Sequence, residues 1–356
     1  MTLHDEQERV QKAVNNSLSY VQEDPWLTQR VLAQAKGEEP VKKKLSASAI
    51  LVIVLITVSV TAALAAGIIS LNRTLEDRLQ VTDDITTAYE NTDLINTPLL
   101  AAENNGITVI LDQCVVDNNC AYIAFQVKGY RPAAGVRPSF EDVMISVDGF
   151  QETDINWNFA YYDYEHKDEE SDSEGDELTF IANVLLFDQD KSLIGQKMNI
   201  TLKNIGTYVV DPSRPEQGLT FNQDVEGVWN FGWVLKGTDM HLDLTDLALP
   251  IGGTGSVLTS LHLSPISVRM QMTVPREPVS EDPMEDNAPY FYGLKYQDGT
   301  ELSELGNGGG EGYESKDSEV YMQFWNLDRV IDLNQVSSIL FVNPFGENEL
   351  IEVRIN

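Results

Sequence analysis

The sequence predicts a mainly β protein with short cytoplasmic helices, one transmembrane helix and two extracytoplasmic β-sandwich domains of the Ig-like kind. Residues 45–71 contain no charged side chain over 27 positions, and a helix of about 20 apolar residues can already cross a bilayer. Beyond them, short runs alternate hydrophobic and polar residues and are separated by turn residues, which is typical of antiparallel sheets. These two observations together predict the fold class.

Residues 1–44 predict two short helices in a cytoplasmic segment. Their apolar side chains recur at helical spacing: Val10, Val14, Leu18 and Val21 in the first helix, and Trp26, Leu27 and Val31 in the second. A segment of this length is too small to bury such side chains within itself. We therefore expect these residues to bind a cytoplasmic protein partner.

The apolar segment 45–71 is predicted to stay in the mature protein as a single membrane span. It lies too far from the N-terminus and is too long for a secretory signal peptide. Lys42, Lys43 and Lys44 directly precede it, and basic flanks are retained in the cytoplasm. Within the span, a small-residue stripe at positions 59, 63 and 67 would let two copies approach as a homodimer, although such spacing is common in alanine-rich spans.

After the span, we expect a stalk over residues 72–105 and two β domains over residues 106–210 and 211–356. Ile107 to Leu111 and Ile123 to Val127 alternate as half-buried strands would, and residues 306–312 are expected to be a flexible glycine-rich loop. Of the 24 basic and 56 acidic residues, seven of each lie in residues 1–44, so the rest of the chain carries the net charge of −32. Such a charge repels nucleic acid, which excludes it as a partner of the outer part.

Cys114 and Cys120 are the two cysteines of the sequence, and they flank a predicted turn at Asp117. A disulfide between them is feasible in an oxidising compartment, provided that the strand register places them opposite each other. Two free thiols in a sheet are the alternative. Their spacing does not match a Cys-x-x-Cys metal or redox motif.

Two runs carry aromatic side chains at alternate positions: Trp157, Phe159 and Tyr161, and Trp229, Phe231 and Trp233. Alternate aromatics on a strand could form a platform that stacks sugar rings of a cell wall. The inward face of a sheet would produce the same alternation, and we expect these residues to be core.

The sequence predicts no catalytic residue, no cofactor and no metal site, and therefore no enzyme. It contains no His-Glu-x-x-His motif, no Gly-x-Ser-x-Gly elbow and no phosphate-binding loop. His262 lies between Ser260 and Ser264, where we expect a solvated side chain on the polar face of a strand. The acidic run 168–176 lacks the carboxylate that a calcium loop needs at its last position.

Several stretches resemble anti-sigma-factor-like single-pass membrane proteins of Gram-positive bacteria, whose outer part is a domain of unknown function. The resemblance is carried by "DPWLTQRVLAQAKGEEPVKKKLS", "GITVILDQCVVDNNCAYIAFQVKG", "GVWNFGWVLKG", "LHLSPISVRM" and "VIDLNQVSSILFVNPFGENELIEV". It implies an inner segment that holds a sigma factor and an outer part that senses the envelope. Residues 1–44 contain no cysteine and only His4, so a zinc-stabilised inner domain is excluded.

The function expected from these features is that of a non-enzymatic envelope sensor or regulator in the cell membrane. The alternative is a structural module that binds an envelope or cell-wall ligand and is merely anchored by its transmembrane helix.

Overall fold

The computed structural model describes residues 71–89, 92–132, 136–162, 177–188, 191–210, 219–276, 288–315, 317–345 and 349–355. Residues 71–356 form one compact unit. The predicted inner helices and the expected span up to residue 70 lie outside the described residues. Within the described ranges, no helix is both long enough and apolar enough to cross a membrane.

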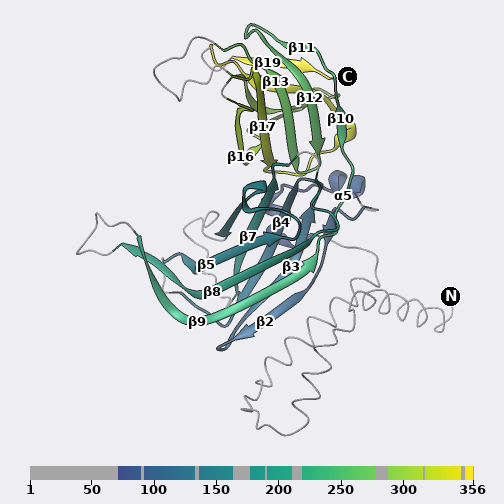
Figure 1. Ribbon diagram of the computed structural model, residues 1–356. Helices are drawn as coiled ribbons and strands as arrows, with labels where there is room; N and C mark the ends of the chain where they lie inside the picture. Colours follow the sequence, from purple (N-terminus) through teal and green to yellow (C-terminus); the bar gives the residue numbers. More distant parts are fainter. Residues whose placement is uncertain are drawn as a thin grey trace, which may run out of the picture. The chain divides into compact units, whose positions relative to one another are not determined.

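The described unit is mainly β, as the sequence predicts, and its paired strands run antiparallel (Figure 1). The first lobe has two sheets, one ordered β1-β3-β4-β7-β6 with β2 also paired to β3, and one ordered β5-β8-β9. The bounds are β1 (Ile95–Asn96), β2 (Leu100–Asn104), β3 (Ile107–Val116), β4 (Cys120–Lys128), β5 (Pro138–Val147), the 3-10 helix η1 (Glu152–Asp154), β6 (Ile155–Tyr161), β7 (Glu177–Leu186), β8 (Lys197–Val210) and β9 (Leu219–Val234).

The two sheets of the first lobe share one hydrophobic core, which we call the first core. Phe125 on β4 and Phe231 on β9 contribute to it from opposite sheets, with ring centroids 5.5 Å apart and an edge-on geometry. Phe140 on β5 and Trp229 on β9, which belong to one sheet, also have an edge-on geometry, with ring centroids 5.7 Å apart. Such edge-to-face pairs add to the stability gained from burial alone.

The second lobe also has two sheets, ordered β10-β12-β13-β17-β16, with β11 paired to β12, and β15-β14-β18-β19. Buried residues of both sheets form the second core, which includes Leu261, Met270, Phe291 and Phe341. The bounds are β10 (Leu242–Leu244), β11 (Leu249–Ile251), β12 (Ser256–Ser264), β13 (Ser267–Thr273), β14 (Tyr290–Tyr296), β15 (Glu301–Ser303), β16 (Gly306–Tyr313), β17 (Val320–Leu327), the 3-10 helix η3 (Leu333–Gln335), β18 (Val336–Val342) and β19 (Leu350–Arg354).

The structure corrects three sequence predictions about organisation. Residues 72–105 are not a stalk, because they form helices α4 (Arg73–Arg78) and α5 (Asp83–Tyr89) and strands β1 and β2, and the two strands pair with β3. The first lobe does not end at residue 210, because β9 pairs with β8 along its length. The glycine-rich segment is strand β16, which pairs with β17.

Strand β4 is buried on both faces, so the expectation of one solvated face is wrong there. Ile123 and Phe125 point into the first core, while Tyr122 and Ala124 between them are also fully buried. A strand with two buried faces carries hydrophobic residues at nearly every position. The opposite face of β4 is therefore covered by other parts of the chain, and these form the site described below.

The disulfide prediction is wrong, because both cysteines are free and buried. Cys114 pairs with Ile123 across the hairpin, and Cys120 pairs with Leu185 on β7. Cys114 belongs to the first core, whereas Cys120 faces the other side of the sheet. The register thus fails the condition on which the disulfide depended, since the two side chains point to opposite faces.

Candidate functional site

The two lobes meet at a buried cluster that also contains the segment directly following the expected span. We call it the junction cluster. Its buried members are Leu75, Leu79, Tyr89, Leu94, Val115, Cys120, Tyr122, Ala124, Tyr162, Ile181, Leu185, Ile266 and Val330. They come from α4, α5, the larger sheet of the first lobe and two loops of the second lobe. Leu71, the last residue of the expected span, packs against this cluster.

Asn72 fixes the start of the described chain to the first lobe. Its backbone N–H donates to Oε1 of Gln113 at 2.6 Å, and its side-chain amide donates to a carboxylate oxygen of Asp112 at 2.6 Å. Its Oδ1 accepts from the N–H of Leu75 at 2.9 Å and so caps α4. An N-cap of this kind is worth about 1 kcal/mol. The polypeptide is therefore held in place from the residue after Leu71.

The same segment also contacts the second lobe. The carbonyl of Leu79 accepts from the N–H of Val330 at 3.0 Å, and the phenol of Tyr89 donates to the carbonyl of Ile331 at 2.7 Å. The amide of Gln80 donates to Asp328 at 3.2 Å. The segment that contains α4 and α5 thus bonds both lobes at the place where they meet.

Asp117 is a buried carboxylate shared by the two lobes. In the hairpin turn of the first lobe, Oδ1 accepts from the N–H groups of Asn119 at 2.8 Å and Cys120 at 2.7 Å. Oδ2 accepts from the N–H of Ile266 at 3.2 Å and the hydroxyl of Ser267 at 2.8 Å, both in the second lobe. Burial raises the pKa of Asp117 to about 6, and these four donors limit the increase. At neutral pH the carboxylate is mostly ionised and fully bonded.

Tyr122 makes the second polar link between the lobes. Its fully buried hydroxyl donates to the carbonyl of Leu327 at 2.6 Å and accepts from the amide of Asn326 at 2.7 Å. A weaker contact joins it to the amide of Asn307 at 3.4 Å. Burial is the largest cause that raises the pKa of the Tyr122 phenol. The hydroxyl consequently keeps its proton and can donate at any physiological pH.

Arg269 supplies the third link. Its guanidinium donates to the carbonyls of Leu186 at 3.0 Å and Asp188 at 3.1 Å in the first lobe, and it lies over the ring of Phe324 at 5.3 Å. Asp117, Tyr122 and Arg269 therefore connect the lobes through directional hydrogen bonds. Sequence reasoning missed Tyr122 and Arg269, because no local motif marks a residue whose partners lie in the other lobe.

The aromatic runs are mainly core, as predicted. Trp229, Phe231 and Tyr161 are buried, and Phe159 and Trp233 pack against the same core. Trp157 is the exception, because 38% of it is exposed on β6. The candidate partner-binding residues of the inner helices lie outside the described residues.

His262 is not a fully solvated side chain, contrary to expectation. It faces Asp243 across the β10–β12 pair, and it stacks on His241 with ring centroids 4.7 Å apart. Nitrogen and oxygen atoms of these three side chains lie within 4.8 Å of one another. They are the group in the described part of the chain whose spacing could hold a metal ion.

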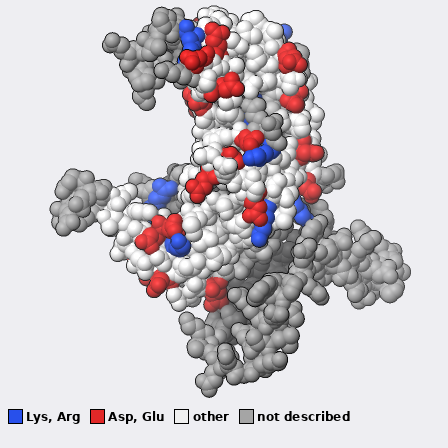
Figure 2. Space-filling model, in the orientation of Figure 1, with Lys and Arg blue, Asp and Glu red and all other residues white. Residues whose placement is uncertain are grey.

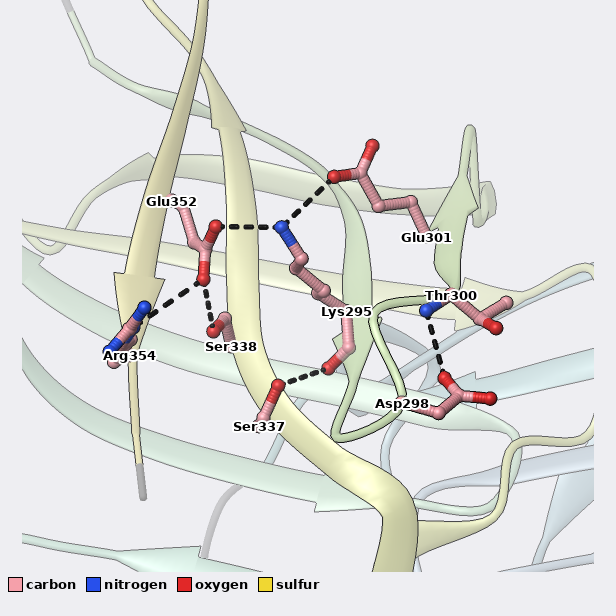
Figure 3. Close-up of polar contacts among 8 residues, drawn as sticks. All are labelled: Lys295, Asp298, Thr300, Glu301, Ser337, Ser338, Glu352 and Arg354. Atoms are coloured by element: carbon pink, nitrogen blue, oxygen red, sulfur yellow. Dashed lines mark hydrogen bonds and ion pairs between the residues drawn. The ribbon is translucent and has the colours of Figure 1, made fainter.

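A further polar cluster lies on the second lobe around Lys295 (Figure 3). Its ammonium contacts Glu352 at 2.9 Å and Glu301 at 3.2 Å, and Glu352 also accepts from the hydroxyl of Ser338 at 2.8 Å. The hydrogen bonds from Lys295 and Ser338 lower the pKa of Glu352. Because these residues lie on β14, β15, β18 and β19, the cluster connects the four strands of one sheet.

On the face shown in Figure 2, the described residues carry scattered acidic side chains, several of them beside a Lys or Arg. Lys191 pairs with Asp154 and Asp188, each at 2.9 Å, and Lys203 pairs with Asp142 at 2.8 Å. Pairs this exposed contribute little to stability.

Comparisons with known proteins identify no family. No family model matches the chain, and no curated protein matches it. A solved structure described as "the crystal structure of the conserved domain protein from Bacillus anthracis" is similar over 75% of this chain and 87% of that chain, with 14% identity and a TM-score of 0.45. A likeness at this level carries no inference about function.

Proposed function

We propose that this protein is a membrane-anchored envelope regulator of the anti-sigma-factor-like kind, in which two outer β-sandwich domains bias the binding of a cytoplasmic partner. The observation that supports it most is the packing of the segment after the expected span. α4 begins one residue after Asn72 and bonds both lobes at their junction. The proposal gives this segment the role of transmitting changes from the lobes to the span.

The physical argument concerns the flexibility of the segment between the outer domains and the span. A flexible stalk would let the outer domains reorient without moving the span, since a disordered linker does not fix the geometry of its ends. Here the chain is held by hydrogen bonds from Asn72 onward and by burial of Leu75 and Leu79. A change in the arrangement of the lobes would therefore displace α4 and the chain that leads into it.

The polar character of the junction favours a change between two discrete arrangements. Asp117, Tyr122 and Arg269 hold the lobes through directional bonds. A buried donor or acceptor without a partner costs free energy, so an arrangement in which only some of these bonds are broken would be unfavourable. The bonds would therefore break and re-form together when the lobes change arrangement. A ligand that binds one arrangement more tightly would shift the equilibrium by the difference in its two affinities.

The cytoplasmic end of the proposal rests on the apolar stripe of the inner helices. We expect Val14→Asp with Leu18→Asp to remove a cytoplasmic protein, of the sigma-factor class, from complexes recovered out of solubilised membranes, because each buried aliphatic side chain contributes ~1.5–3 kcal/mol. The matched control is Asn16→Asp with Ser19→Asp, which adds the same charge on the opposite helical face. Equal recovery of partners by both double variants and the wild type would contradict the proposal.

A second candidate function is that of an anchored module that binds a wall polymer. The exposure of Trp157 on β6 favours it, since an exposed aromatic ring offers an apolar face on which a sugar ring can stack. Trp157→Ala should then lower co-sedimentation of the protein with purified cell wall at least several-fold, whereas Tyr208→Ala, also exposed, should not. Unchanged sedimentation of Trp157→Ala would exclude this surface.

A further inference from the structure

His241, Asp243 and His262 come together at one edge of the second lobe. His241 directly precedes β10, Asp243 lies within it, and His262 lies on β12. Asp243 is the direct cross-strand partner of His262. Directly opposed residues of antiparallel strands have their Cβ atoms about 5 Å apart on the same face, so the pairing itself places a carboxylate beside an imidazole.

Alternation along β10 adds the third side chain. Leu242 and Leu244 pack against the second core, so His241 and Asp243 project from the other face. That face is accessible: His241 and Asp243 are exposed, and His262 is half-buried. The three ligand atoms lie within 4.8 Å of one another, and β10 is an edge strand of its sheet, which leaves room for side chains to adjust.

The surrounding hydrogen bonds orient both imidazoles. Nδ1 of His241 lies 2.5 Å from the carbonyl of Asp239, so this nitrogen donates its proton and leaves Nε2 free to bind a metal. Nε2 of His262 is 3.4 Å from the hydroxyl of Ser264, while Nδ1 lies 3.9 Å from Asp243. A backbone carbonyl that fixes the tautomer of a histidine is a typical outer partner of metal ligands.

One positive charge lies beside the three side chains. Arg269 is paired with His262 in the sheet, so its charge opposes a cation there. Its guanidinium is, however, bonded to the carbonyls of Leu186 and Asp188 in the first lobe.

We propose that His241, Asp243 and His262 bind one divalent transition-metal ion, with zinc as the best match. Two imidazoles and one carboxylate are typical zinc ligands, whereas calcium and magnesium prefer sites made of oxygen alone. Tetrahedral ligands at 2.0–2.2 Å from zinc stand roughly 3.4 Å apart. The exposed His241 must therefore move inward by about an ångström or more and turn out of its stack on His262.

Such an ion would connect the segment between β9 and β10, which joins the two lobes, to the second lobe. His241 ends the segment that follows β9, in which the N–H of Thr238 donates to the carbonyl of Val116 in the first lobe. Three protein ligands leave a fourth position for water or an external ligand. The site does not depend on the proposed regulatory function.

The test is binding of CoCl2 and ZnCl2 to the full chain, purified in detergent without a histidine tag. We expect one Co2+ per chain, with the visible absorption of a four-coordinate site, and its displacement by one equivalent of Zn2+. His241→Ala and His262→Ala should each weaken binding ~100-fold or more, since even outer partners of metal ligands are worth 10–100-fold. A His4→Ala and His166→Ala double variant removes the other two histidines and should bind like the wild type.

The absence of saturable binding by the wild type, or equal affinity of the wild type and His241→Ala, would overturn the proposal. The circular dichroism of each variant is compared with that of the wild type. If His262→Ala fails to fold, His241→Ala decides the outcome, because its side chain is exposed.

Discussion

Tyr122→Phe is the substitution that isolates the hydrogen bonds between the lobes. It removes a single oxygen from a fully buried ring and leaves the hydrophobic contacts of that ring in place. The lost oxygen bonds Leu327 at 2.6 Å and Asn326 at 2.7 Å, both in the second lobe. Any loss of stability therefore reports the polar link and not a cavity.

The expected magnitude follows from the partners that remain. A hydrogen bond is worth about 1 kcal/mol net, and a buried polar group left without a partner costs about 1–3 kcal/mol. The carbonyl of Leu327 and the amide of Asn326 both lose the phenol, so we expect a loss of about 2–4 kcal/mol. For a unit of this size, that corresponds to a urea midpoint roughly 1 M lower.

The assay is urea unfolding of the full chain in detergent, followed by tryptophan fluorescence, with hydrogen exchange as a local readout. The N–H groups of Ile266 and Val330 bond across the junction and should exchange faster in the variant. The control is Tyr208→Phe, which changes an exposed phenol and should shift stability by under ~0.5 kcal/mol. A Tyr122→Phe variant as stable as this control would refute the role given to the hydroxyl.

Three further predictions concern Asp117, Asn72 and the two cysteines. Burial raises the pKa of Asp117 from 3.8 to about 6, so the folded state holds this proton more tightly than the unfolded state. The resulting stability is present below pH 3.8 and is lost as the pH rises through 6. The stability of the wild type relative to Asp117→Asn should therefore fall by roughly 2–2.5 kcal/mol between pH 4 and 7, and a constant difference would contradict the assignment. Asn72→Ala should lower the free energy of unfolding by about 1–3 kcal/mol and speed hydrogen exchange across α4, because it removes the helix cap and a side-chain hydrogen bond to Asp112. Unchanged exchange in α4 would show that Asn72 does not fix this segment to the first lobe. Cys114 and Cys120 are buried free thiols, so in the absence of reductant they should react with iodoacetamide only after the protein is unfolded. A mass of the unreduced protein that is two hydrogens below that of the reduced protein would reveal a disulfide instead.

The β class of the fold was predictable from local patterns, since alternation and turn residues are encoded within each strand. The burial of α4 had a signal that the stalk prediction missed: Leu71, Leu75 and Leu79 recur every four residues, which is one helical face. The predicted domain boundary at residue 210 was wrong because it separates β8 from β9, and these two strands pair with each other. The hydrophobic pattern of a strand does not indicate which other strand it pairs with.

The sites were less predictable because their members are distant in the sequence. Asp117 could be identified as a turn residue, but its bonds to Ile266 and Ser267 span about half of the described unit. His262 reaches Asp243 through the register of β10 and β12, which no spacing rule encodes. The cysteine register was equally hidden, since the loop length alone did not show that Cys114 opposes Ile123.

The central claim is that the lobe junction is mechanically coupled to the inner segment through α4. Its most direct test is the recovery of cytoplasmic partners from solubilised membranes by the wild type, by Tyr122→Phe, and by Tyr122→Phe with a flexible Gly-Ser insertion between Leu71 and Asn72. The insertion would let the outer lobes move without displacing the span. The account predicts that Tyr122→Phe changes the recovery of partners and that the insertion abolishes this change. Identical recovery by all three proteins would contradict the coupling.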